Sequence, residues 1–258
     1  MMDFNKFPIL YEEEIRKAVE DFIFEKFDSQ KETDEENFIC HEITSEYVHS
    51  DVYNFDCSVL PNTRVYVSCG MGARSQNSLR PGYDHIELMM FGSENLKNDI
   101  DVMNQLVNLS KYPFRTSSWL GPFHTIDVTE KIKEKFGYSY LWFLPEIFGE
   151  LDVEDSLEAY TIKFLPLVPL YEEERNVLAR MDDASEELRD SLLEAIREDI
   201  SMFHIDVPRP NFAPDTEPEV EIPDELREAF ARDIKDMLQE FIDMGDIDYE
   251  DDEDCEDE

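Results

Sequence analysis

Four side chains that could bind a metal ion or exchange protons stand close together in the stretch HEITSEYVHSDVY, residues 41–53. They are His41, Glu42, His49 and Asp51. Two histidines that ligate one zinc ion from a helix stand four residues apart, as in HExxH, but His41 and His49 are eight apart. On one regular strand this spacing places them roughly 26 Å from each other. A shared metal site would need a turn between them, so we favour a strand that carries structural polar side chains.

A second candidate for chemistry is the stretch CGMGARS, residues 69–75. Its glycines, Gly70 and Gly72, lack the further residues of a phosphate-binding GxGxxG or GKS loop, so they predict a tight turn after a strand. Cys69 could act as a nucleophile only beside a histidine base, whereas a buried cysteine at a strand end is far commoner.

A lone histidine, His124, lies among apolar residues in WLGPFHTI, residues 119–126. A histidine in such a setting is more often a core or turn residue with satisfied hydrogen bonds than a catalytic base. The sequence contains no GxSxG motif, and its dense negative charge makes any pair of carboxylates uninformative. The sequence therefore predicts a protein that is not an enzyme and that uses no cofactor or metal.

The charge of the whole chain restricts its partners. Among 258 residues, 63 are acidic and 23 are basic, which gives a formal net charge of −40. Coulomb repulsion disfavours binding to nucleic acid or to an anionic membrane, whereas a basic protein would be attracted. Residues 246–258 form an acidic tail, which either keeps the chain in solution or contacts a cationic partner.

Cysteine and hydropathy patterns indicate the cellular compartment. The four cysteines form no CxxC pair, and a chain of this size has enough core without disulfides, so reduced thiols are expected. The first residues lack the pattern of a signal peptide, and no run of 18 apolar residues occurs. These patterns predict a cytoplasmic protein. We also expect a monomer or a weak dimer, although no pattern in the sequence determines the oligomeric state.

Helical and extended patterns alternate irregularly, which predicts an α/β (α+β) domain: a mixed β-sheet flanked by helices, with a helical acidic C-terminal extension. Helical spacing covers 11–27, 98–112 and 172–203, with a break near 181–185. Extended patterns cover 39–57, 64–69, 86–91, 140–148 and 159–171, and prolines in the last two are expected at strand ends or edges. The predicted organisation is a domain over 1–180, a helical extension over 181–206, a proline-rich linker over 207–223, an amphipathic helix over 224–245 and disorder over the acidic tail.

Six segments carry a pattern that extends beyond local structure. In chain order they are HEITSEYVHSDVYNF (41–55), YVSCGMGAR (66–74), IELMMF (86–91), LSKYPF (109–114), FHTI (123–126) and FLPLVPLYEEE (164–174). Together they resemble the Suppressor of fused domain family, in its bacterial branch. The resemblance implies an α/β sandwich-like domain that binds proteins and has no known chemistry. Its motif positions, most of which we expect to determine the fold, are His49, Asp51, Gly70, Met71, Gly72, Glu87 and His124.

The resemblance also directs the functional hypotheses. It implies transcription-factor binding for animal members and neutralisation of secreted toxin domains, as immunity proteins, for bacterial members. The extension after residue 180 is short and acidic, so we do not carry transcription-factor binding over. We predict an immunity protein whose acidic surface covers a cationic toxin domain.

The predicted contact region is the acidic C-terminal part of the chain, 224–258. Within the acidic tail, contacts with the partner are expected from Asp246, Asp248, Tyr249, Glu250, Asp251 and Asp252. Two alternatives stay open. One is a regulatory or scaffold module that captures an extended peptide of a partner protein. The other is an enzyme in which His41, His49, Asp51 and Cys69 converge.

Overall fold

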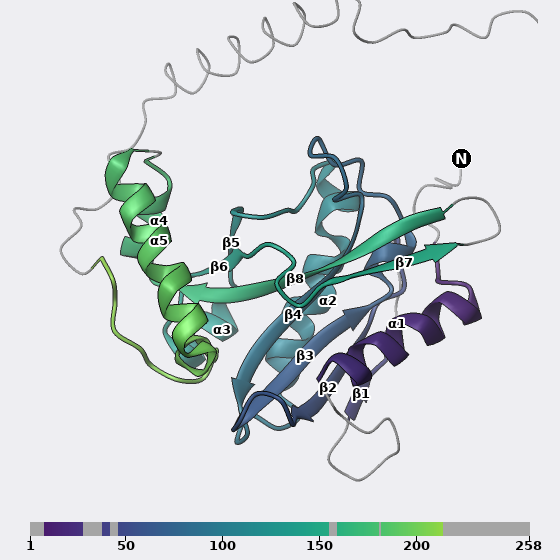
Figure 1. The fold of residues 1–258 in the computed structure, drawn as a ribbon, viewed down its shortest axis with the longest axis horizontal. Coiled ribbons are helices and arrows are strands. Elements are labelled where there is room, and N and C mark those ends of the chain that lie inside the picture. Colours follow the sequence, from purple (N-terminus) through teal and green to yellow (C-terminus); the bar gives the residue numbers. More distant parts are fainter. Residues whose placement is uncertain (1–7, 28–37, 42–45, 155–158, 181, 214–258) are drawn as a thin grey trace, which may run out of the picture. The chain divides into compact units, whose positions relative to one another are not determined.

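A computed structural model describes residues 8–27, 38–41, 46–154, 159–180 and 182–213 (Figure 1). The helix predicted over 224–245 and the acidic tail lie outside these residues. In chain order the elements are α1 (Glu13–Lys26), β1 (Phe38–Cys40), β2 (Asp51–Cys57), β3 (Thr63–Cys69), η2 (Met71–Ala73), β4 (His85–Ser93), α2 (Ile100–Thr116), β5 (Thr125–Asp127), α3 (Glu130–Phe136), β6 (Tyr140–Phe143), β7 (Glu150–Glu154), β8 (Ala159–Leu170), α4 (Glu172–Leu178), α5 (Asp183–Glu198) and η3 (Ile200–Phe203).

The described strands form one mixed sheet of eight, in the order β1-β2-β3-β4-β8-β6-β5, with β7 paired to β8. Strands β4 and β8 run parallel, and the other neighbouring strands run antiparallel. Five α-helices of the described chain flank this sheet. The predicted α+β fold with a mixed sheet is confirmed.

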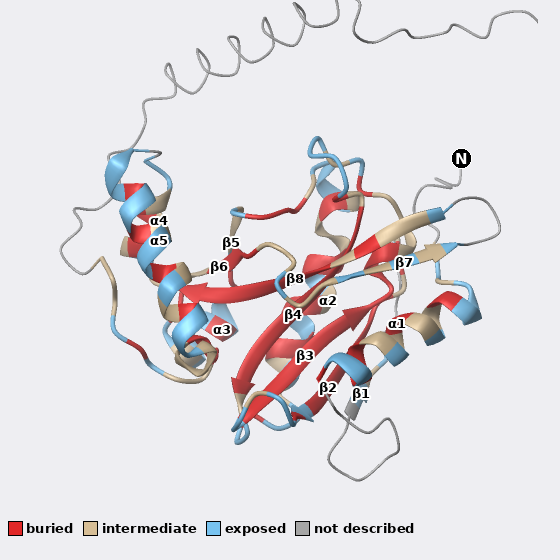
Figure 2. Ribbon diagram, in the orientation of Figure 1, coloured by how far each residue is buried: buried red, intermediate tan, exposed pale blue. Residues whose placement is uncertain are grey.

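The central strands are buried on both faces of the sheet (Figure 2). Successive side chains of a strand point to opposite faces. On β3, Val65 and Val67 pack in one core with Val19 of α1, whereas Tyr66 packs in a second core with Leu106 of α2. Because helices cover both faces, these strands are nearly continuous apolar runs in the sequence rather than alternating patterns.

Helix α5 covers the part of the sheet formed by β6 and the end of β8. Leu192 and Ile196 pack with Trp142 of β6 and Val168 of β8 in a third core. Val168 shares a face of β8 with Phe164, which belongs to the core under α1. Helices α1 and α5 therefore lie over one face of the sheet, and α2 and α3 lie over the other.

The helical stretch expected over 172–203 is confirmed, divided into α4, α5 and η3. The Asp182 side chain accepts a hydrogen bond from the Ser185 amide and caps α5, so the break predicted near 181–185 is confirmed as well. None of the described helices combines the length and the apolar character that a membrane crossing requires.

The expectation that prolines lie at strand ends or edges is wrong for Pro166, which stands inside β8 between neighbouring strands. It is confirmed for Pro169, the next-to-last residue of the strand. On one side, β7 pairs with β8 up to Lys163 and β6 pairs from Leu167, so Pro166 lies in the gap between these two partners. On the other side, pairing with β4 ends at Leu167, so Pro169 lies beyond it. A missing N–H is tolerated where the neighbouring strand stops.

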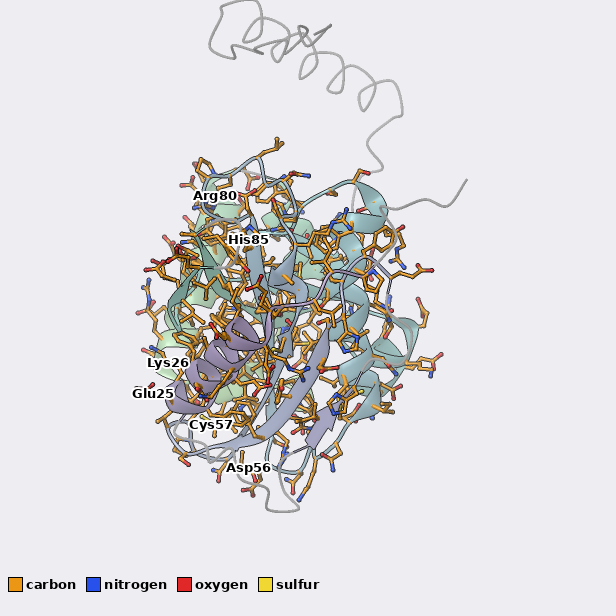
Figure 3. All side chains as sticks on the ribbon, turned by 90° about the vertical axis from the view of Figure 1, so that its right-hand side faces the viewer. Glu25, Lys26, Asp56, Cys57, Arg80 and His85 are labelled. Atoms are coloured by element: carbon orange, nitrogen blue, oxygen red, sulfur yellow. The ribbon has the colours of Figure 1, made fainter. Side chains whose placement is uncertain are left out.

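Different contacts close the sheet at the two ends of its central strands, which are marked in Figure 3 by the labels Cys57 and His85. At one end the Cys57 thiol, 3.9 Å away, and the Ser58 amide, 3.2 Å away, donate to the carbonyl of Phe27, which follows α1. At the other end β4 begins at His85, whose Nδ1 lies 2.8 Å from the Gly72 carbonyl oxygen. The motif residues of β2, β3 and β4 gather at this second end.

The segment after α5 packs back onto the sheet. The Ile205 amide donates to the Phe91 carbonyl of β4 at 2.9 Å, and His204 Nε2 lies 3.0 Å from the Thr63 hydroxyl. Of the linker predicted over 207–223, residues 207–213 are described, and they continue this packing through Arg209. The predicted division of the chain at residue 180 stays a prediction.

Arg209 forms a buried ion pair with Glu174 of α4. Its two terminal nitrogens lie 2.6 Å from the two carboxylate oxygens, and both side chains are almost fully buried. Nη2 also donates to the Pro169 carbonyl at 2.9 Å, and the guanidinium lies 4.8 Å from the ring centre of Phe203. This pair joins the last described segment to both α4 and β8.

Candidate functional site

Three side chains converge on the carboxylate of Asp51, which is 1% exposed. Arg16 Nη2 of α1 lies 2.8 Å from Oδ2, and His41 Nδ1 lies 3.2 Å from the same oxygen. His49 Nε2 lies 3.2 Å from Oδ1. The two histidines, eight residues apart, are brought together because β1 and β2 run antiparallel with Cys40 opposite Val52. The two histidines are therefore not held apart on one continuous strand, because β1 and β2 are separate strands.

This cluster is an ion-pair network around a buried carboxylate. Arg16, which the sequence patterns did not single out, supplies the permanent positive charge that such a carboxylate needs. Arg16 also contacts Glu20 at 3.1 Å, and the Tyr53 hydroxyl donates to the same Glu20 oxygen at 2.5 Å. Within the described ranges, no group of three or more His, Cys, Asp or Glu side chains is arranged to hold a metal ion. The convergence named by the enzyme alternative is present, because both histidines contact Asp51 and Cys69 lies opposite Asp51 in the pairing of β2 with β3. Whether this cluster has any activity stays a prediction.

Glu87 of β4 is a second buried carboxylate, and it holds the turn that follows β3. Its Oε1 accepts hydrogen bonds from the Gly70 amide at 2.8 Å, the Gly72 amide at 3.1 Å and the Tyr11 hydroxyl at 2.7 Å. Its Oε2 accepts one from the Ser68 hydroxyl at 2.5 Å. Burial raises the pKa of the Glu87 carboxyl, and these hydrogen bonds oppose the rise. The GMG and IEL segments of the sequence are one hydrogen-bonded unit.

Each glycine of this turn lies against another segment. Gly70 has a φ of +133°, and a Cβ there would stand 1.9 Å from the His49 carbonyl oxygen. A Cβ on Gly72 would stand 2.3 Å from the Tyr11 hydroxyl, and Met71 between them is buried in the core on the α2 side. The tight turn predicted after strand 64–69 is confirmed. That most motif positions serve the fold stays a prediction.

Burial shifts the pKa of both Cys69 and His124 so that each favours its uncharged form. Burial raises the pKa of the Cys69 thiol well above its ordinary value, and the nearby Glu87 carboxylate raises it further. The thiol is therefore protonated and a poor nucleophile. Burial lowers the pKa of His124, whose ring centre lies 4.3 Å from that of Trp119. His124 is a neutral imidazole packed on an indole.

Helix α5 presents an acidic face to solvent. Its exposed acidic residues recur along one side and are Asp183, Glu186, Glu187, Asp190, Glu194 and Glu198. Residues four apart on a helix are neighbours, so this acidic face contains like-charged pairs such as Glu186 with Asp190, each of which costs about 0.2–0.5 kcal/mol. Helix α1 instead pairs opposite charges, as in Arg16 with Glu20. The acids of the first turn, Asp183 and Glu186, recover part of this cost beside the positive end of the helix. The acidic face of α5 therefore presents a high density of negative charge to solvent.

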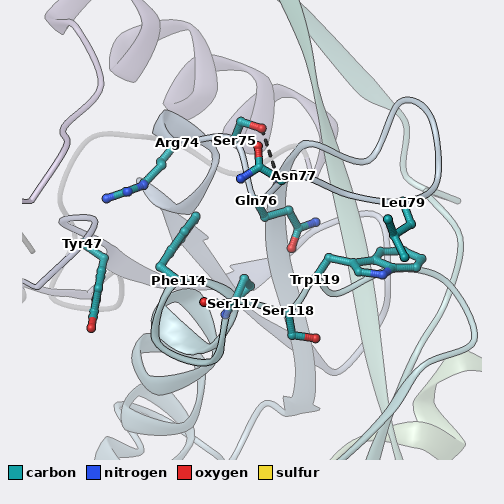
Figure 4. A pocket seen from close by; sticks show the side chains of 11 residues that line it. Tyr47, Arg74, Ser75, Gln76, Asn77, Leu79, Phe114, Ser117, Ser118 and Trp119 are labelled. Atoms are coloured by element: carbon teal, nitrogen blue, oxygen red, sulfur yellow. Dashed lines mark hydrogen bonds between the residues drawn. The ribbon is translucent and has the colours of Figure 1, made fainter. Parts of the chain in front are cut away.

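Two adjoining pockets flank Trp119 in the loop after α2 and together form the Trp119 groove. The first has a volume of about 570 Å³, with Arg74 and Phe114 on one side and Leu79 and Trp119 on the other (Figure 4). The second, of about 390 Å³, shares Ser118 and Trp119 with the first and extends along strand β5. Of the described residues that line the groove, none is acidic, although 63 of the 258 residues in the chain are.

The sequence patterns placed the partner contacts in the acidic C-terminal part, which lies outside the described residues. They did not indicate α5 or the Trp119 groove as contact surfaces. The sequence does contain a pattern that indicates the acidic face of α5, because acidic residues recur every three or four positions through a helical stretch. No local pattern indicates the Trp119 groove, because its walls come from segments far apart in the sequence.

Comparison with known proteins gives relationships that agree with this fold. Residues 46–209 match the family described as Suppressor of fused protein (SUFU). A solved Suppressor of fused homologue from Neisseria gonorrhoeae FA 1090 is 15% identical, with a TM-score of 0.50 over 71% of this chain and 91% of that chain. A chain in the Sufu–Fu complex is 14% identical, with a TM-score of 0.50 over 85% and 96%. No curated protein matches the chain. Because the family match covers more than half of the chain and most of the motif segments, the resemblance is confirmed: this chain belongs to the Suppressor of fused family.

Proposed function

We propose that this chain is a non-enzymatic protein-binding domain that covers a cationic partner, as an immunity protein that neutralises a basic toxin domain. The observation that carries the proposal is the acidic face of α5. Membership of the Suppressor of fused family supports it, because a related structure is itself a complex of Sufu with Fu. The proposed mechanism is steric: the bound domain blocks access to the active site of the toxin.

The physical basis of binding is electrostatic steering followed by contact. A field of one sign raises the encounter rate with an oppositely charged protein by roughly 10–1,000-fold at low salt. The net charge of −40 supplies such a field. At physiological salt, charges more than about 8 Å apart are largely screened, so the final complex depends on the carboxylates at the contact itself. The acidic face of α5 supplies exposed carboxylates that a lysine- or arginine-rich surface can cover.

Two variants with the same change in net charge test where the partner binds. The test variant is E186K/E187K/D190K on α5, and the control variant is E13K/E14K/E25K on α1. We expect the test variant to slow association with a partner captured from the source cell by about tenfold or more at low salt, and the control to slow it less. Association rates measured over a range of salt concentrations check this result.

The captured partner itself completes the test. We expect a basic protein that arrests growth when it is produced alone in a bacterial host, with growth restored when this chain is produced alongside it. A neutral or acidic partner, or equal effects of the α1 and α5 variants, would contradict the proposal.

The acidic tail is proposed as an additional contact, through Asp246, Asp248, Tyr249, Glu250, Asp251 and Asp252. Deleting 246–258 is expected to slow association with the captured partner and to weaken its salt dependence, because most residues of the tail are acidic. The same rate measurements check this prediction, and an unchanged rate would remove the tail from the contact region.

A second candidate function, the capture of an uncharged extended peptide by a regulatory or scaffold module, is favoured by the Trp119 groove. Its described walls combine aromatic rings with hydroxyl and amide groups and include no acid, and strand β5 runs along it. The E186K/E187K/D190K variant would still capture a partner that binds in this groove, whereas the Trp119→Ala variant would no longer capture it. The association rate of such a partner would depend little on salt concentration.

A further inference from the structure

A pocket of about 520 Å³ lies at the C-terminal end of α5, on the helix that carries the acidic face. Its walls come from residues 60–63, from Ile147 and Phe148, and from residues 196–201. We refer to it as the end pocket. Its volume lies within the range of about 300–1,000 Å³ that is typical of ligand sites, and it is large enough for one bulky side chain.

The floor of the end pocket is apolar and held in place by the core. Phe148 packs against Phe27 and Phe91, with ring centres 5.2 and 5.4 Å away, and Ile196 is buried beneath α5. Ile147 stands at the mouth and is 53% exposed. A preformed apolar floor binds a side chain at low cost in conformational entropy, because little has to be ordered on binding.

The rim of the end pocket continues the negative charge of α5. Glu198 and Asp199 both line the pocket and are exposed. Asp199 accepts hydrogen bonds from the Ser201 hydroxyl at 2.6 Å and from the Ser201 amide at 2.9 Å, and these bonds lower the pKa of its carboxyl. Asp199 is therefore ionised at neutral pH. The one cation among the described lining residues, Arg197, is exposed and lies between Ile196 and Glu198 in the sequence.

We propose that the end pocket receives a bulky apolar side chain from a basic segment of the partner, whose flanking lysines or arginines contact Glu198, Asp199 and the acidic face of α5. The inference rests on the proposed function and names the surface and the chemistry of the partner segment. An apolar anchor buried in a pocket and surrounded by a polar rim is the usual arrangement of an interface hot spot. The acidic face alone would attract any cation, whereas the pocket selects a segment with an anchor.

Other occupants fit the charges poorly. A second copy of this chain would bring its own acidic surface against the same rim. The apolar stripe predicted within 224–245 of this chain is accompanied by more acidic than basic residues, so the rim would repel it. A basic segment is the occupant for which charge and apolar area agree.

The test uses three blocked pentapeptides as probes and the full chain as the receptor. The peptides are Lys-Lys-Phe-Lys-Lys, Lys-Lys-Gly-Lys-Lys and Glu-Glu-Phe-Glu-Glu. The readout is the δ1-methyl resonances of Ile147, Ile196 and Ile200, which all line the end pocket. We expect the basic peptide with phenylalanine to shift these three methyl resonances, the glycine peptide to bind about tenfold more weakly, and the acidic peptide not to bind.

A matched pair of surface variants separates the anchor from charge attraction. Ile147→Ser is expected to weaken binding of the phenylalanine peptide by about tenfold and to leave the glycine peptide unchanged. Ile100→Ser, at a site that is 53% exposed and lies outside both the end pocket and the Trp119 groove, is expected to change neither. Both side chains are exposed enough that the variants should fold.

Each contrary outcome has a distinct meaning. Equal binding of both basic peptides, with no effect of Ile147→Ser, would overturn the anchor and leave the charge-based function standing. Preference for the acidic peptide would overturn both. If the three methyl resonances shift with protein concentration when no peptide is present, the end pocket binds a second copy of this chain. Shifts on deleting 214–258 would assign it to the chain's own C-terminal segment.

Discussion

Replacing Arg209 by alanine is expected to lower the free energy of unfolding by about 3–5 kcal/mol, the usual cost of removing one partner of a buried ion pair. The substitution leaves the fully buried Glu174 carboxylate without the two hydrogen bonds at 2.6 Å that neutralise it. It also frees the last described segment from α4 and β8, because Arg209 contacts the Pro169 carbonyl. Urea unfolding followed by circular dichroism measures the loss.

Two further variants show whether the ion pair is the cause. Arg180→Ala removes an exposed arginine near the end of α4 and is expected to change stability by no more than about 0.5 kcal/mol. The double variant Arg209→Met/Glu174→Leu removes both charges together and is expected to be more stable than Arg209→Ala, because no buried charge is left unpaired. A loss for Arg209→Ala as small as that for Arg180→Ala would show that the pair contributes little.

Replacing Gly70 by alanine is expected to destabilise the fold by about 4 kcal/mol or more, or to prevent folding altogether. The new Cβ would stand 1.9 Å from the backbone carbonyl oxygen of His49, and backbone cannot move aside as a flexible side chain can. Moving the turn would also displace the Gly70 amide from the Glu87 carboxylate, a buried acceptor that needs its donors. The yield of folded protein and its urea midpoint measure the effect.

Gly137→Ala is the matched control for this prediction. Gly137 also has a positive φ, +82°, but a Cβ there meets nothing within 4 Å. Only the backbone strain of about 1–2 kcal/mol is expected. Equal losses of stability for Gly70→Ala and Gly137→Ala would mean that the contact with His49 is relieved at little cost. The fold would then not require glycine at position 70.

Local patterns were sufficient for the longer elements and for the fold class, but they did not predict the short elements β5, α3 and β7. The stripe of Ile15, Val19 and Ile23 predicts the helix that buries these residues as α1, and the apolar runs predict the central strands. The family resemblance rests on the same local segments. Such features are encoded by neighbours in the sequence, which is why they can be recognised without the structure.

Contacts between distant segments were not encoded in this way. Whether prolines are tolerated inside β8 depends on where β4, β6 and β7 stop, which no pattern within residues 159–171 reveals. The ion pair of Arg209 joins a proline-rich stretch without periodicity to α4, 35 residues away. The convergence of His41 and His49 on Asp51 depends in the same way on the pairing of β1 with β2.

Strand β8 lies between β4 and β6, although it is the last of the described strands along the chain. While the chain is being synthesised, β1 to β4 leave the ribosome first. The antiparallel pair of β5 and β6, which α3 connects, follows without a strand that joins it to them. Until β8 is made, the apolar edge of β4 has no partner, and an unpaired edge of this type attracts other strands. A nascent chain that is halted before residue 159 should therefore be a substrate for chaperones, and its two half-sheets can unite only when β8 inserts between them.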